Sequence, residues 1–180
     1  MRSSKLFPIS AFVLMVLFSS AAGELKPTTH KGFFLNFGFG GGTADLNEEG
    51  FQTDRKGGVT FNLRLGGALK QNLLLAGEID AWRKEEGGAA IQFNNYAATL
   101  TYYPTQILFL KAGPAYSAAT AEAFGFSETE SGFGFTGGLG TELRLTQKFA
   151  LIPMAQFIVQ DYDGFSTNFF SITLDVGWFW

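Results

Sequence analysis

The sequence contains no cysteine and a single histidine, His30. Without cysteine the chain forms no disulfide and carries no lipid on an N-terminal cysteine. The Cys and His sets that hold structural zinc are excluded as well. A catalytic site that needs a base titrating near neutral pH has only His30 to draw on. We therefore expect a protein that is not an enzyme, with no cofactor and no metal.

Basic residues are also scarce, with 13 Lys and Arg against 16 Asp and Glu and a net charge of −3. Nucleic-acid binding needs clustered Lys and Arg, so no nucleic-acid partner is expected. Beyond its N-terminus the chain has no run of about 20 apolar residues, the length of a membrane-spanning helix. Glycine and phenylalanine are abundant instead, at 23 and 21 residues, which favours strands and close backbone approaches.

The N-terminus has the three parts of a secretory signal peptide. Arg2 and Lys5 supply the positive start, residues 6–18 form a short apolar core, and residues 19–23 are small. An uncleaved membrane anchor is the alternative, and the shortness of the apolar core disfavours it. We expect a cleaved signal peptide over residues 1–23, a short periplasmic lead over 24–31 and one barrel domain over 32–180.

A period of two recurs along the rest of the chain. In residues 58–69 and 170–180, apolar side chains alternate with polar or tiny ones, as a strand with two different faces requires. A helix would spread the same residues around its whole circumference. Six further segments fit the strand pattern: 32–42, 73–82, 91–103, 107–117, 132–145 and 149–160.

The connections between these segments alternate in length. Short turns fall at residues 70–72, 104–106 and 146–148, and longer polar loops at 43–57, 83–90, 118–131 and 161–168. Short periplasmic turns that alternate with longer external loops are typical of outer-membrane barrels. The pattern predicts an all-β fold, an eight-stranded antiparallel up-and-down transmembrane β-barrel with both termini in the periplasm.

Pairing across the short turns indicates what fills the barrel. If the turns are symmetric, Arg64 lies opposite Glu78 and, with Thr105 at the centre of its turn, Thr99 lies opposite Lys111. Small residues also face large ones, as a lumen filled by side chains needs: Gly138 faces Gln156 and Gly140 faces Met154. The charges on the polar faces predict a structural network in the lumen: Arg64, Glu78, Asp80, Lys111, Glu142, Arg144 and Asp175.

Aromatic residues and prolines add two expectations. Aromatic rings near strand ends suit the girdles at membrane interfaces: Trp82, Tyr96, Tyr102, Tyr116, Phe133, Trp178 and Trp180. Pro114 and Pro153 fall inside predicted strands, where each loses a ladder hydrogen bond, so a bulge or a strand end is expected near both. A soluble lipocalin-like barrel would show the same alternation with its apolar face turned inward.

The closing strand carries a family resemblance. Residues 169–180, FFSITLDVGWFW, resemble the aromatic-terminated last strand of the small eight-stranded outer-membrane barrels, the family of OmpX, the OmpA transmembrane domain and the opacity-type proteins. The resemblance implies the outer membrane of a Gram-negative bacterium and an assembly signal at Trp178 and Trp180 for the barrel-assembly machinery. The last residue here is Trp, where Phe is more usual. Enzymes of this family use a histidine at the external rim, whereas His30 falls at the other end and is expected to be solvated.

These observations predict a non-enzymatic barrel with a closed lumen and a structural or surface-interaction role through acidic external loops. Its expected surroundings are outer-membrane lipid and lipopolysaccharide, with the protein a monomer and the partner of the loops unknown. The alternatives are a narrow conduit for small solutes and a soluble periplasmic binder of a small apolar ligand. Two further features allow a functional interpretation that we do not favour. Glu78 and Asp80 could form a catalytic acid pair, but a structural, salt-bridged role is favoured. The acidic loops could bind Ca²⁺, but a solvated surface is favoured.

Overall fold

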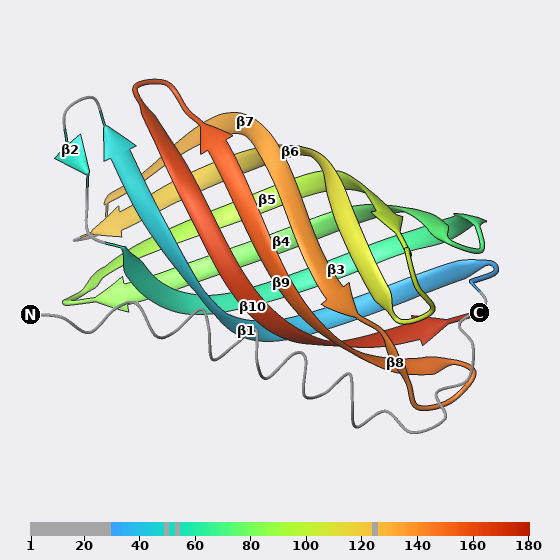
Figure 1. Ribbon diagram of the computed structural model, residues 1–180. Helices are drawn as coiled ribbons and strands as arrows, with labels where there is room; N and C mark the ends of the chain where they lie inside the picture. The colour runs from blue at the N-terminus through green and yellow to red at the C-terminus, as the bar shows by residue number, and fades with distance from the viewer. Residues whose placement is uncertain (1–29, 49–50, 53–54, 124–125) are drawn as a thin grey trace, which may run out of the picture.

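The computed structural model describes residues 30–48, 51–52, 55–123 and 126–180, and strands dominate this part of the chain (Figure 1). The predicted signal peptide, and the lead before His30, lie outside the described residues. Among those described, no helix is long and apolar enough to cross a membrane. Eight long strands and two short pieces are formed: β1 (Phe33–Glu48), β2 (Phe51–Gln52), β3 (Lys56–Lys70), β4 (Leu73–Glu86), β5 (Ala89–Tyr102), β6 (Leu108–Ala123), β7 (Phe126–Thr141), β8 (Leu143–Arg144), β9 (Phe149–Asp161) and β10 (Phe165–Phe179).

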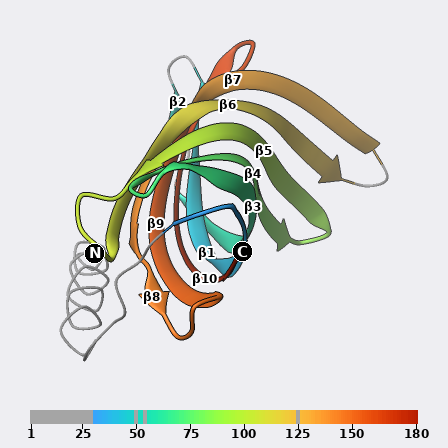
Figure 2. The same ribbon diagram turned by 90° about the vertical axis from the view of Figure 1, so that its right-hand side faces the viewer.

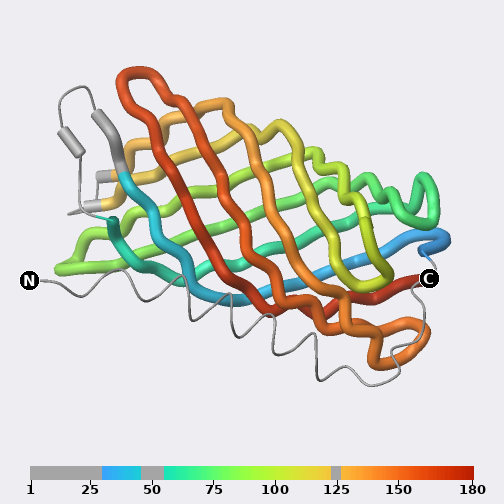
Figure 3. Tube along the Cα trace, in the orientation of Figure 1, coloured from blue at the N-terminus to red at the C-terminus, as the bar shows by residue number. Residues whose placement is uncertain are grey.

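The long strands close into a barrel. Each pairs antiparallel with the next along the chain, and β10 pairs with both β9 and β1, so the sheet closes on itself (Figures 1 and 3). The turns after β3, β5 and β8 gather at the end where the C-terminus lies (Figure 1). We call this end the periplasmic end, since the short turns are expected to face the periplasm, and the opposite end the external end. The predicted eight-stranded up-and-down barrel is confirmed.

The apolar face of the barrel points outward. Phe37, Leu65 and Val176 are 51%, 59% and 46% exposed, whereas their neighbours Asn36 and Arg64 are almost completely buried. A water-soluble barrel would place the apolar set inside, because a continuous apolar outer surface is unfavourable in water. The orientation therefore contradicts the lipocalin-like alternative and fits a barrel whose outer surface contacts lipid.

Several strands run further toward the external end than predicted. Strand β1 continues to Glu48 instead of ending at residue 42, and β6 continues to Ala123 instead of residue 117. The predicted loop 83–90 reduces to a hairpin turn at Gly87 and Gly88, whose φ angles of 61° and 84° suit glycine. Outside the membrane both faces of a strand meet water, so the two-residue period fades while the backbone ladder continues. The long external loops were therefore predicted too long.

The strand registers around two of the short turns agree with the prediction. Arg64 pairs with Glu78, and the two small-to-large pairs also form, Gly138 with Gln156 and Gly140 with Met154. The β5–β6 register is different, because Lys111 pairs with Thr101 and not with Thr99. In that turn the Thr105 hydroxyl accepts a hydrogen bond from the Leu108 amide at 3.0 Å, and the centre of the turn lies one residue later than assumed.

The two prolines behave differently. Opposite Pro153 strand β7 ends at Thr141, and the chain pairs with β9 again only from Leu143, so the expected strand end is present. Near Pro114 neither a bulge nor a strand end forms. The β5–β6 register is the same on both sides of the proline, and only the pairs of Pro114 and of its neighbour Gly113 are missing. The register shift that the structure does show lies between Ala68 and Lys70.

Candidate functional site

A cluster of buried charges crosses the middle of the lumen. Glu78 on β4 is paired with Lys111 on β6, and Arg64 on β3 places its Nε 3.5 Å from Glu78 Oε2. Lys111 Nζ also donates to Gln156 Oε1 at 2.8 Å. The side chains of Arg64, Glu78 and Lys111 are at most 3% exposed. Because two cations face one carboxylate, the charge of Glu78 is fully compensated in a place from which water is excluded.

Glycine makes room for this central cluster. A Cβ at Gly138 would lie 3.0 Å from the Cε of Lys111, so a larger residue would displace the lysine. On the opposite wall Gly38 pairs with Asp175, and the Asp175 carboxylate accepts hydrogen bonds from Asn62 at 3.1 Å and Thr173 at 2.8 Å. The lumen at this level is filled by side chains rather than open.

The seven predicted lumen residues do not form one network. Arg64, Glu78 and Lys111 make the central cluster, while Asp175 bonds to its neighbours on β3 and β10. Asp80 is 1% exposed, and its Oδ2 has no hydrogen-bond partner among the described residues. The remaining two residues, Glu142 and Arg144, lie together at the periplasmic end.

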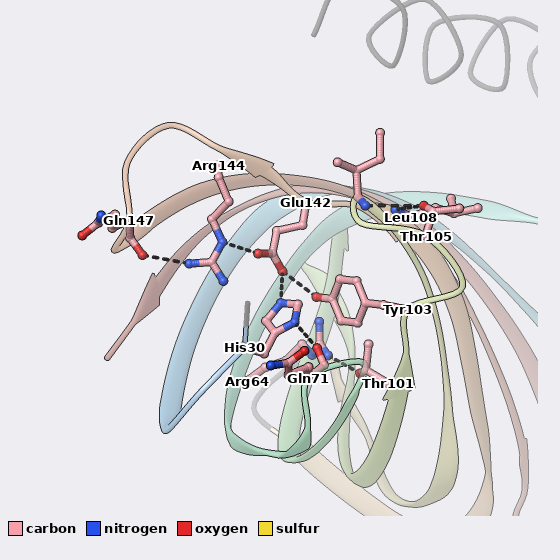
Figure 4. A network of polar contacts seen from close by, with 11 residues as sticks. His30, Arg64, Gln71, Thr101, Tyr103, Thr105, Leu108, Glu142, Arg144 and Gln147 are labelled. Carbon is pink, nitrogen blue, oxygen red and sulfur yellow. Dashed lines mark hydrogen bonds and ion pairs between the residues drawn. The ribbon is translucent and has the colours of Figure 1, made fainter. Parts of the chain in front are cut away.

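Glu142 is the centre of a second cluster, at the periplasmic end (Figure 4). Its Oε2 lies 3.0 Å from His30 Nε2 and accepts a hydrogen bond from the Tyr103 hydroxyl at 2.5 Å. Its other oxygen accepts a hydrogen bond from Arg144 Nε. His30 Nδ1 lies 2.9 Å from the carbonyl oxygen of Gln71, so both ring nitrogens face oxygen atoms. We call these five residues the periplasmic cluster.

The expectation of a solvated His30 was wrong. His30 is 3% exposed, and its ring lies 4.3 Å from that of Tyr103 and 5.8 Å from that of Phe179. The Arg144 guanidinium also lies over the Phe179 ring, 3.5 Å from its centre. The contact that buries His30 joins positions 112 residues apart, so no local pattern in the sequence signals it.

The cluster changes the acidity of Glu142, which lies in the segment between β7 and β8. Burial alone would raise the pKa of its carboxyl group. The hydrogen bond and charge of His30, together with the charge of Arg144 and the hydrogen bond of Tyr103, outweigh burial and lower the pKa below its usual value. The ionised form of Glu142 is therefore the form that the folded periplasmic end favours.

An aromatic layer fills the external end of the lumen. Trp82, 2% exposed, donates from Nε1 to the carbonyl oxygen of Gly42 at 3.1 Å and packs against Phe93 and Phe169. The assignment of Trp82 to an interface girdle was therefore wrong. It has the same parity on β4 as Glu78, so it faces inward. The other predicted girdle residues are exposed on the outside: Tyr96, Tyr102, Tyr116, Phe133, Trp178 and Trp180.

The ionisable side chains of the interior are enclosed by other side chains. Among the described residues there is no group of three His, Cys, Asp or Glu side chains that could hold a metal ion. His30 is engaged at the periplasmic end, and the pair of acids at Glu78 and Asp80 lies between the aromatic layer and the periplasmic cluster. A substrate would have to displace one of these layers to reach them.

A closed eight-stranded barrel with an apolar outer face and a polar, filled interior defines a small outer-membrane β-barrel protein. Comparison with protein families supports this class: residues 10–177 match the model described as "Outer membrane protein beta-barrel domain". The chain belongs to this family. It is a protein of the outer membrane of a Gram-negative bacterium.

Solved structures of such barrels are similar in fold and distant in sequence. Neisserial surface protein A (NspA) gives a TM-score of 0.71 at 13% identity, over 83% of this chain and 98% of that one. Ail, the attachment invasion locus protein of Yersinia pestis, gives 0.54 at 17%, over 82% and 99%. OprG from Pseudomonas aeruginosa gives 0.53 at 12%, over 86% and 99%. No curated protein matches the sequence. At these identities the similarity shows the fold alone.

Proposed function

We propose that this protein is a non-enzymatic outer-membrane barrel with a sealed lumen, whose role lies in its acidic external surface. The observation that carries the proposal is the filling of the interior at successive levels. The aromatic layer around Trp82, the central cluster around Glu78 and the periplasmic cluster around Glu142 follow one another along the barrel axis. Each is buried, so the barrel interior offers no site for chemistry on a solute.

The sealed lumen argues against the alternative of a solute conduit. Eight strands enclose an interior only just wide enough for side chains. Here that interior contains Arg64, Lys111 and Gln156 reaching across it, each at most 3% exposed. A permeating ion would have to break the pair of Lys111 and Glu78, which costs about 3–5 kcal/mol when a buried pair loses a partner.

The external end carries an uneven charge. The four basic residues there all pair with acids: Arg55 with Asp45, Lys56 and Lys84 with Glu86, and Arg83 with Glu85 and Glu122. Four other acids at this end have no ion pair within the described ranges: Glu128, Glu130, Asp161 and Asp163. The uncompensated negative charge lies on β7 and on the β9–β10 hairpin, and it favours a cationic partner.

Two further proposals concern the surroundings of the barrel. Trp178 and Trp180, 42% and 60% exposed on the outside of the last strand, suit an assembly signal read by the barrel-assembly machinery and an anchor at the lipid interface. The outward apolar band suits contact with outer-membrane lipid and lipopolysaccharide. Since every long strand is paired with two neighbours where the barrel closes, and only the external end of β7 extends beyond β9, we expect a monomer.

Two measurements test the proposed function. In planar lipid bilayers, the purified full chain should produce no conductance steps under conditions in which a general porin does. Reproducible steps would overturn the sealed lumen.

In lipid nanodiscs, fluorescent poly-lysine should bind to the protein in a salt-dependent manner. A variant with Glu128→Gln, Glu130→Gln, Asp161→Asn and Asp163→Asn should lose most of this binding, whereas the control Glu85→Gln should retain it. Equal binding by both variants would refute the role of the acidic surface.

A further inference from the structure

A hollow of about 280 Å³ opens at the external mouth of the barrel. One wall is apolar, formed by Ile91 and Phe93 on β5 and by Phe165 at the start of β10, and a second wall carries Glu128 and Glu130 on β7. Between these walls the lining consists of short β6 side chains: Ala119, Thr120 and Ala121. The hollow lies above the aromatic layer that closes the lumen, because Ile91, Ala119 and Phe165 pack against that layer.

The hollow follows from strand lengths. Strand β7 begins at Phe126, but its pairing with β9 begins only where Phe133 lies opposite Asp161. The hairpins β4–β5 and β6–β7 therefore stand apart from the β9–β10 hairpin at this end (Figure 2). Strand β9 does not reach the part of β7 that precedes Phe133, so no neighbouring strand fills the space beside this part of β7.

Side-chain size along the register shapes the hollow further. Ile91 lies opposite Ala121 and Phe93 opposite Ala119. The same alanines lie opposite the acids on β7: Ala121 opposite Glu128 and Ala119 opposite Glu130. Across strands β5, β6 and β7, each set of neighbours thus consists of a large apolar residue, an alanine and a glutamate. Because the alanine in the middle is small, space remains between the apolar residue and the carboxylate.

The charges and the aromatic rings that line the hollow indicate which kind of ligand it suits. Glu128 and Glu130 are exposed and have no ion pair within the described ranges, in contrast to Glu86 on β4 and Glu122 on β6. Aromatic faces attract organic cations, and Phe93 and Phe165 line the hollow. Phe165 is held in place by stacking on Tyr162, with ring centres 4.6 Å apart and planes at 8°. An anion would be repelled here.

We propose that this hollow binds a small organic cation with an apolar body, of the alkylammonium or arylammonium class. The apolar body lies against Ile91, Phe93 and Phe165, and the ammonium group points toward Glu128 and Glu130. The volume is near the lower limit of small-molecule pockets, so the ligand is a small molecule and not a polymer. The site shares Glu128 and Glu130 with the acidic surface proposed above. A small cation needs the hollow as well as these two acids, so its binding remains to be measured on its own if poly-lysine fails to bind.

The probe is benzyltrimethylammonium, titrated calorimetrically into the full chain in nanodiscs of uncharged lipid, with empty nanodiscs as blank. The uncharged isostere, in which carbon replaces the nitrogen, and benzenesulfonate are the comparison ligands. We expect saturable binding of the cation, at least about tenfold tighter than that of the isostere, from the carboxylates and aromatic faces together. Absence of saturable binding by the folded protein, or equal affinity for the cation and the isostere, would overturn the proposal.

Variants locate the site. Glu128→Gln with Glu130→Gln should weaken binding of the cation by about tenfold and leave the isostere unaffected, while Glu85→Gln with Glu86→Gln should change neither. Ala121→Phe should fill the hollow and abolish binding of both ligands, with Ala112→Phe on the lipid-facing side of β6 as control. The compact unboiled band on a gel verifies folding of each variant. Unchanged cation binding by the folded Ala121→Phe variant would refute the location.

Discussion

His30 Nε2 lies 3.0 Å from Glu142 Oε2 and joins the residue that precedes the first strand to the segment that follows β7. The contact spans the periplasmic mouth, and the same carboxylate accepts hydrogen bonds from Tyr103, directly after β5, and from Arg144 in β8. The end of the barrel is therefore closed by side chains from three separate parts of the chain. The stability of this end of the barrel depends on the charge of one buried acid, Glu142. Mutation of its partners and a change of pH should therefore both alter that stability.

Replacement of His30 by alanine should destabilise the barrel. The change removes the partner of Gln71 O and one of three partners of Glu142, and we expect the free energy of unfolding to fall by about 1–3 kcal/mol. The measurement is urea unfolding in lipid vesicles, followed by loss of the compact unboiled band. Lys31→Ala is the control, because Lys31 is exposed beside it. A His30→Ala variant that unfolds together with the control would show that the histidine is not holding this end.

Acid should weaken the same cluster. Because the folded pKa of Glu142 lies below the usual value of 4.5, the unfolded chain binds its proton first as the pH falls. The contribution of Glu142 to stability is therefore complete above that value and is lost as the pH drops through the lowered folded pKa. We expect Glu142→Gln to be less stable than the wild type at neutral pH, and the difference to shrink steadily in acid. A difference in urea midpoint that stays constant below about pH 4 would contradict this.

The sequence was sufficient for the barrel because each spanning strand must satisfy two different surroundings. Apolar residues such as Leu65 and Val176 face lipid, and polar residues such as Arg64 and Asp175 face the lumen. The alternation of apolar and polar residues is therefore strong wherever a strand crosses the membrane. This two-residue alternation ends at the membrane surface, whereas β6 continues beyond it into water. The strand ends, and with them the hollow above the aromatic layer, depend on how far each ladder continues, which a period of two does not encode.

The candidate sites were predictable to different degrees. Arg64 and Glu78 were placed together by the symmetry of one short turn, whereas the Thr105 turn shifted the partner of Lys111 by two residues. His30 could not be placed, because its contacts arise only when the barrel closes. Trp82 could have been placed inside by its parity with Glu78; its position near a strand end was the weaker indicator.

The central cluster should behave as a coupled unit. Lys111→Met leaves Glu78 buried with Arg64 alone, and we expect a loss of about 3–5 kcal/mol in the free energy of unfolding. In the double variant with Glu78→Gln the carboxylate is gone, so the loss should be smaller than the sum of the two single losses by about 1–3 kcal/mol. Lys148→Met, in the exposed turn before β9, is the control. Additive losses in this urea-unfolding cycle would show that the two side chains act separately.

The three tryptophans of the chain provide a direct test of which face meets lipid. Trp82 is 2% exposed inside the lumen, whereas Trp178 and Trp180 are 42% and 60% exposed on the outer face of the last strand. Lipids brominated near the headgroup quench only the tryptophans that they touch. Removing Trp82 with Trp82→Phe should raise the quenched fraction of the remaining fluorescence, because the emission lost was protected. The pair Trp178→Phe and Trp180→Phe should abolish most quenching. The opposite result would mean that the barrel presents its other face to the membrane.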